Sequence, residues 1–242
     1  MIERPSPNFD DRRDAQPIDM LVLHYTGMTS AAAALERLCD PSAKVSAHYL
    51  IDEDGTVVRL VAEEARAWHA GVSCWRGHRD INSRSIGIEL VNPGHEFGYR
   101  SFPEPQMASL EGLARDIVAR HPIPPRNVVG HSDIAPTRKQ DPGERFDWGR
   151  LARAGVGLWP FDDLGAPSGP AEVGIDVVQE WLGDFGYDVT RSGRLDDPTI
   201  AAVEAFQRHF RPALVQVQVQ VQGFPDRNTV ARLESLVLLA RR

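Results

Sequence analysis

IDMLVLHYTG, at residues 18–27, joins a short apolar run to a histidine. The run IDMLVL is bounded by more polar residues, which is the pattern of a buried β-strand. His24 follows it directly, so the sequence predicts an imidazole at the point where the strand leaves the sheet. Thr29 and Ser30 come next, and their hydroxyls can cap a helix over the segment AAAALERL.

Downstream, strand-like and helical segments alternate. HYLIDEDGTVVRLV, at residues 48–61, contains two strand-like runs around an Asp-Gly pair that favours a tight turn. SIGIELV at 85–91 and NVVGH at 127–131 are typical of strands, and apolar residues at helical spacing predict a helix over 104–120. Strands separated by helices, with one hairpin, predict an α/β fold in which a mixed central sheet is flanked by helices.

The composition changes in the last third of the chain. Residues 159–172 are rich in Pro and Gly and lack periodicity, which predicts a linker between domains at 1–158 and 173–242. In the second domain, GRLDDPTIAAVEAF and GFPDRNTVARLESL each combine a turn, an N-cap and an amphipathic helix. With a helix at 173–185 they predict a small all-α unit of three helices. The alternating VQVQVQVQ at 215–222 has the strand period and fits an extended arm, an edge strand or a mobile loop.

Charge and composition exclude several classes of protein. The formal net charge of −7 argues against a basic surface for nucleic acid or anionic membranes. The N-terminus lacks the apolar core of a signal peptide, and no apolar stretch approaches the length of a membrane span. We therefore expect a cytoplasmic protein without membrane insertion. Cys39 and Cys74 form no C-x-x-C pair, and buried or partly buried thiols are the simplest interpretation.

Three residues have the chemistry of a hydrolytic zinc site. Such a site uses three protein ligands and keeps one position open for water. His24 ends one predicted strand, His131 ends another, and Asp141 lies in the loop that follows. Their spacing alone is weak evidence, because no H-E-x-x-H helix is present.

Five segments together carry a specific resemblance. They are HYTG at 24–27, SAHYLIDEDGTV at 46–57, AWHAG at 67–71, SIGIELVN at 85–92 and GHSDIAPTRKQDPGERFDW at 130–148. In this order they resemble the motifs of the zinc-dependent N-acetylmuramoyl-L-alanine amidases, in their AmpD-like bacterial branch. The resemblance implies one zinc ion per chain, held by His24, His131 and Asp141. It also implies hydrolysis of the amide bond between N-acetylmuramic acid, or its 1,6-anhydro form, and L-alanine of a peptidoglycan stem peptide.

The same resemblance assigns roles to further residues. It implies that Glu89 transfers protons between the attacking water and the leaving amine, and that Lys139 stabilises the oxyanion. Phage relatives use a tyrosine where this chain has Ala47, so Glu89 is expected to act without it. Candidates for substrate contact, each of which also fits a structural role, are Tyr25, His48, Trp68, His69, Trp75 and Asn82.

The C-terminal segment resembles a three-helix peptidoglycan-binding domain, so peptidoglycan or muropeptide fragments are the expected partners. A wall-binding module also makes the periplasm an alternative to cytoplasmic recycling of anhydromuropeptides. Two other functions stay open: a non-catalytic peptidoglycan receptor of the same fold, and a zinc peptidase that cuts within the stem peptide. The sequence leaves the oligomeric state, the stem-peptide preference and the choice between anhydro and intact sugar undetermined.

Overall fold

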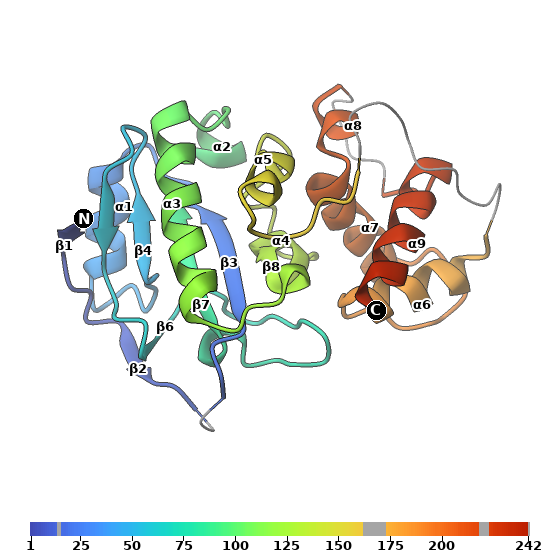
Figure 1. The fold of residues 1–242 in the computed structure, drawn as a ribbon, viewed down its shortest axis with the longest axis horizontal. Coiled ribbons are helices and arrows are strands. Elements are labelled where there is room, and N and C mark those ends of the chain that lie inside the picture. The colour runs from blue at the N-terminus through green and yellow to red at the C-terminus, as the bar shows by residue number, and fades with distance from the viewer. Residues whose placement is uncertain (14–15, 162–172, 218–222, 242) are drawn as a thin grey trace.

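The computed structural model describes residues 1–13, 16–161, 173–217 and 223–241. A six-stranded mixed sheet of order β1-β5-β4-β7-β3-β8 forms the centre of its first part (Figure 1). These strands are β1 (Ile2–Glu3), β3 (Met20–Tyr25), β4 (Tyr49–Ile51), β5 (Val57–Arg59), β7 (Ser85–Leu90) and β8 (Val128–Gly130). A two-stranded antiparallel sheet combines β2 (Phe9–Asp11) and β6 (Ala65–Ala67). The predicted mixed sheet is therefore confirmed.

The strand register brings distant residues to one edge of the sheet. β3 lies parallel to β7 on one side and to β8 on the other, while β4 and β5 form the predicted antiparallel hairpin. His24 pairs with Glu89 across β3 and β7, and Leu23 pairs with Gly130, the residue before His131. Because parallel strands end at the same edge of a sheet, the side chains of His24, Glu89 and His131 lie near one another at that edge.

Helices cover both faces of this sheet. α3 (Glu104–Arg120) has the predicted bounds, lies across one face in Figure 1, and packs on apolar residues of β3 and β7. α1 (Ala31–Cys39) packs on the other side with residues of β4 and β5. Its N-cap is Ser30, whose hydroxyl accepts from the N–H of Ala33. The shorter helices are η1 (Ile81–Ser83), α2 (Gly94–Phe97), η2 (Pro125–Asn127), α4 (His131–Ile134) and α5 (Trp148–Arg153).

The C-terminal part contains α6 (Ile175–Phe185), α7 (Asp197–Phe210), α8 (Pro212–Val217) and α9 (Arg227–Ala240). Asp196 and Asp226 cap α7 and α9, as the repeated turn-and-cap pattern predicts. Residues 215–217 of the valine-glutamine repeat belong to α8 and are helical, so the expectation of an extended or strand-like segment is wrong for them. Residues 218–222 and most of the predicted linker, 162–172, lie outside the described residues. None of the helices in the described ranges is both long and apolar enough to cross a bilayer.

The two parts share one buried core. Trp75 of the first part is 1% exposed and makes edge-to-face contacts with Phe185 and Tyr187. Asp133 in α4 accepts hydrogen bonds from the Tyr187 hydroxyl at 2.6 Å and from His209 Nδ1 at 2.7 Å. The helical part therefore packs beside β8 and α4 (Figure 1), and holds the short helix that begins at His131 through a buried carboxylate.

Replacing Asp133 by alanine is expected to lower the free energy of unfolding by roughly 2–4 kcal/mol, because three buried donors, the Tyr187 hydroxyl, His209 Nδ1 and the Gly130 N–H, lose their acceptor. Urea unfolding of the metal-free protein measures this. Asp188→Ala is the control, since this exposed carboxylate pairs with Arg79 at the surface and should cost less than about 1 kcal/mol. Equal effects of the two substitutions would contradict a structural role for the buried contact.

Candidate metal centre and active site

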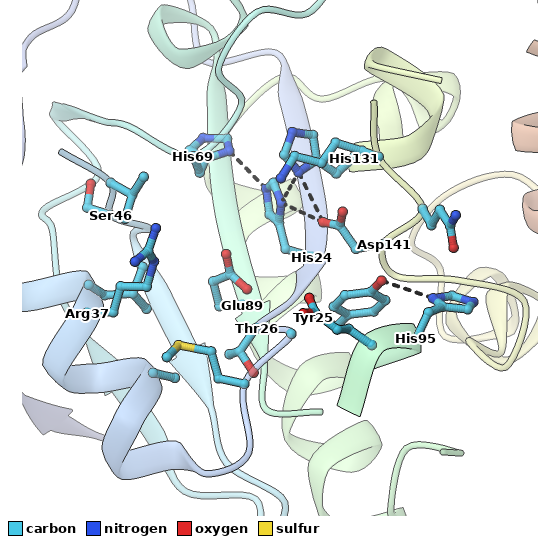
Figure 2. A pocket seen from close by; sticks show the side chains of 18 of the residues that line it. His24, Tyr25, Thr26, Arg37, Ser46, His69, Glu89, His95, His131 and Asp141 are labelled. Atoms are coloured by element: carbon cyan, nitrogen blue, oxygen red, sulfur yellow. Dashed lines mark hydrogen bonds and ion pairs between the residues drawn. The ribbon is translucent and has the colours of Figure 1, made fainter. Parts of the chain in front are cut away.

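Three ligand atoms from separate segments converge at the carboxyl edge of the sheet. His24 Nδ1 lies 3.0 Å from His131 Nδ1, and each nitrogen lies 3.1 Å from Asp141 Oδ2 (Figure 2). His24 is the second-last residue of β3, His131 begins α4, and Asp141 lies in the loop after α4. All three residues are buried, with exposed fractions of 5% or less. This cluster could hold a metal ion.

The hydrogen bond of the His131 ring and the pKa values of His24 and Asp141 suit a bound cation. His131 Nε2 lies 3.1 Å from the Ala70 carbonyl, which only accepts, so His131 Nδ1 is left with a free lone pair. Burial and the neighbouring His131 lower the pKa of His24 to about 4, which keeps it neutral at pH 7. Burial alone would raise the pKa of Asp141, but His131 and His24 hold it well below its usual range. The donor set is thus two imidazoles and one carboxylate.

The cluster lies in a pocket of about 760 Å³ that also contains Glu89 and Lys139. Glu89 projects from β7 into this space (Figure 2), and its Oε2 is buried without a hydrogen-bond partner among the described residues. Burial and the charge of Asp141 raise the pKa of Glu89 well above its usual value, while Lys139 opposes the shift. A cation in the cluster would also oppose it. A buried carboxyl group with a raised pKa is the kind of group that can both take and return a proton.

Lys139 belongs to the loop that carries Asp141. This loop is closed at its base by the Ser132 N–H, which donates to the Asp141 carbonyl at 2.9 Å. The backbone N–H of Lys139 donates to Ala135, also at 2.9 Å. The short loop therefore places Lys139 at the same pocket as the carboxylate ligand Asp141.

Three of the six candidates for substrate contact line this pocket: Tyr25, Trp68 and His69. The Tyr25 hydroxyl lies 3.0 Å from His95 Nδ1, and Trp68 Nε1 donates to Asp10 at 2.9 Å. His69 Nδ1 lies 3.0 Å from His24 Nε2, so it contacts a ligand of the metal cluster.

The other three candidates are not among the residues that line this pocket, and their contact with substrate stays a prediction. His48 is 0% exposed, with its Nδ1 accepting from the Gly87 N–H. Trp75 is buried in the core shared with the C-terminal helices. Asn82 is buried, and its side-chain oxygen accepts from the backbone N–H groups of His69 and Ala70. Each of these three side chains is held in the protein interior by these contacts.

Arg37 and His95 are among the side chains of the pocket that were not predicted from the sequence. Arg37 is exposed on α1, and nothing in the pattern AAAALERL separates it from an ordinary solvent-facing arginine. His95 lies 3.1 Å from Glu144 through Nε2, and its polar surroundings in the sequence gave no signal of this contact.

Comparison with known proteins agrees with this geometry. A family model described as N-acetylmuramoyl-L-alanine amidase matches residues 14–144, and a peptidoglycan binding domain model matches residues 173–233. The chain is 38% identical to the N-acetylmuramoyl-L-alanine amidase AmiD of Escherichia coli over 98% of its own length and 90% of AmiD. The 1,6-anhydro-N-acetylmuramyl-L-alanine amidase AmpD of E. coli is 36% identical, over 61% of this chain and 87% of AmpD.

Solved structures of similar proteins point to the same family. E. coli AmiD in complex with anhydro-N-acetylmuramic acid-L-Ala-D-γ-Glu-L-Lys has a TM-score of 0.79 at 37% identity, covering 94% of this chain and 91% of AmiD. AMPDH3 of Pseudomonas aeruginosa has a TM-score of 0.78 at 34% identity, covering 99% of this chain and 96% of its own. With a family model over more than half of its residues and a relative matched along nearly its whole length, this chain belongs to the N-acetylmuramoyl-L-alanine amidases.

Proposed function

We propose that this chain uses one zinc ion to hydrolyse the amide bond between N-acetylmuramic acid, including its 1,6-anhydro form, and L-alanine of stem peptides. The observation that carries the proposal is the cluster of His24, His131 and Asp141 at the base of the pocket that holds Glu89. Structures of AmiD and AMPDH3 with anhydromuramoyl peptides support the substrate class.

The cluster fits zinc in size and in donor type. Zinc bonds imidazole nitrogen and carboxylate oxygen at roughly 2.0–2.2 Å, so tetrahedral ligand atoms lie roughly 3.3 Å apart. The three ligand atoms here are separated by 3.0, 3.1 and 3.1 Å. When bound, zinc lowers the pKa of a water molecule toward neutrality and polarises the scissile carbonyl.

Glu89 is the residue placed for proton transfer. An amide nitrogen is too basic to leave without a proton, so a nearby group must take one from the attacking water and return it to the alanine amine. The carboxyl of Glu89 faces the pocket without a fixed partner among the described side chains and favours its protonated form through burial. Ala47 carries only a methyl group, so that position supplies no alternative proton carrier.

Lys139 is the residue placed for charge stabilisation. The scissile carbonyl oxygen gains negative charge as water adds to it, and a preorganised cation in a partly enclosed pocket stabilises that charge. Lys139 lines the pocket from the loop that carries Asp141. The nearby Arg138 instead donates to the backbone carbonyls of Ala70 and Val72.

Removing the metal is expected to abolish hydrolysis, and one equivalent of zinc should restore it. Mass spectrometry of the products tests the bond that is cut: a muramoyl tripeptide should yield the whole stem peptide and the free sugar acid. Single amino acids or shortened stems would identify a peptidase instead. Tight binding without any cleavage by the zinc-loaded protein would identify a receptor and overturn the proposal.

A further inference from the structure

We infer that Ser85 and His69 form a hydrogen-bonded relay that fixes the tautomer of His24, so that its Nδ1 presents a lone pair to the metal. Both are positioning residues, since they act on the metal through His24. The inference rests on the proposed zinc site and extends it to a second layer of side chains behind the ligands.

The direction of the relay follows from its far end. The backbone carbonyl of Ile81 can only accept, and Ser85 Oγ lies 2.7 Å from it, so the hydroxyl donates its single hydrogen there. Ser85 Oγ also lies 3.1 Å from His69 Nε2. Since its hydrogen is already used, Ser85 accepts in this second bond, and His69 Nε2 carries the hydrogen.

The same reasoning continues to the ligand. His69 is 8% exposed, and burial disfavours a charged ring, so only one of its nitrogens carries hydrogen. Its Nδ1 therefore accepts, and the partner 3.0 Å away, His24 Nε2, is the donor. This leaves Nδ1 of His24 unprotonated, at the corner of the triangle with His131 and Asp141 (Figure 2).

Two further features hold the relay in place. Asn82 Oδ1 accepts from the backbone N–H groups of His69 at 3.1 Å and Ala70 at 2.8 Å. The Ala70 carbonyl in turn lies 3.1 Å from Nε2 of the second histidine ligand, His131. The dipeptide His69-Ala70 therefore orients both imidazole ligands, one through a side chain and one through a carbonyl.

Gly87 makes room for the relay. A Cβ atom at this position would lie 2.5 Å from the His69 ring, closer than real contacts allow. Ser85 and Gly87 are two apart on β7, so they face the same side of the sheet, with Glu89 next in that row. One face of a single strand thus provides a hydroxyl for the relay, space for its ring and the proposed proton carrier.

Variants of both relay residues test the inference through zinc affinity, measured by competition with a chelator. Ser85→Ala and His69→Leu should weaken zinc binding by about 10–100-fold, the usual effect of losing a group that orients a ligand. His69→Asn keeps an acceptor oxygen near the place of Nδ1 and should recover part of the loss. Ser83→Ala is the matched control, because Ser83 is equally buried in the same segment but its hydroxyl donates to Asp80.

Nitrogen-15 NMR of the metal-free wild-type protein tests the same point without a substitution. It should show hydrogen on Nε2 of His24, and hydrogen on Nδ1 would overturn the inference even if a variant fails to fold. Zinc affinities equal to the wild type in Ser85→Ala and His69→Leu would also overturn it, while the proposed zinc amidase would stand. A wild-type protein that binds no zinc would instead refute the proposed function itself.

Discussion

Replacing Glu89 by glutamine is expected to lower the turnover number on a muramoyl tripeptide by about 10²–10⁴-fold, the usual contribution of a positioned acid or base. Glutamine has nearly the same shape, but it cannot take a proton from water or return one to the leaving amine. Zinc content should stay at one ion per chain, because Glu89 is not part of the ligand triangle. Initial rates and metal analysis of the same sample measure both expectations.

Glu96→Gln provides the comparison for this experiment. Glu96 also lines the pocket, but it is exposed on α2 rather than projecting from the sheet. Its replacement should change the turnover number by less than about threefold, well below the range of a lost acid or base. If Glu89→Gln behaves like Glu96→Gln, another group must carry the protons.

Local patterns predicted the strands that carry the site. The apolar run before His24 and the segment SIGIELV form β3 and β7, since a buried strand needs apolar residues and little else. The sequence pattern does not reveal which strands pair. The paired positions of β3 and β7 are 65 residues apart, and the pairing places His24 opposite Glu89. That register depends on contacts distant along the chain, so the metal cluster could be anticipated only from the family motifs.

The family motifs also did not distinguish residues that line the pocket from residues that are buried in the core. Trp68 and Trp75 lie close together in the sequence, yet one lines the pocket and the other is buried against the C-terminal helices. Both are large aromatic residues in a polar loop, and only the packing of a distant segment decides which one is covered. For the same reason the role of Ser85 was not predicted from the sequence, because its partner His69 becomes a neighbour only after the sheet has formed.

Deleting residues 159–242 is expected to abolish hydrolysis of small muropeptides and of intact sacculi alike. The deletion removes the partners of a buried apolar cluster, to which the first part contributes Met20, Val22, Ala70, Trp75, Ile81, Val129 and Ile134. Full burial of one large apolar side chain is worth roughly 1.5–3 kcal/mol, and the net stability of a domain is roughly 5–15 kcal/mol. Uncovering a few of these side chains therefore removes much of the stability of residues 1–158.

The deletion also reaches the metal cluster. Asp133 would lose Tyr187 and His209, and it lies in the four-residue helix that begins with the ligand His131. We therefore expect residues 1–158 alone to melt at a lower temperature and to bind zinc more weakly than the full chain. Thermal unfolding and chelator competition, run beside the two activity assays, measure these effects.

A chain cut once within residues 162–172 by an inserted protease site is the matched control. If the helices stabilise the catalytic part through their shared core, the cut protein should stay associated and hydrolyse small muropeptides at nearly the full rate. A detachable targeting module predicts a different pattern, in which residues 1–158 keep full activity on small muropeptides and lose only that on sacculi. AmpD, which matches 61% of this chain, indicates that the amidase fold does not always need such helices. In this chain the requirement comes from particular contacts: Trp75 packs against Phe185 and Tyr187, and Asp133 accepts hydrogen bonds from Tyr187 and His209.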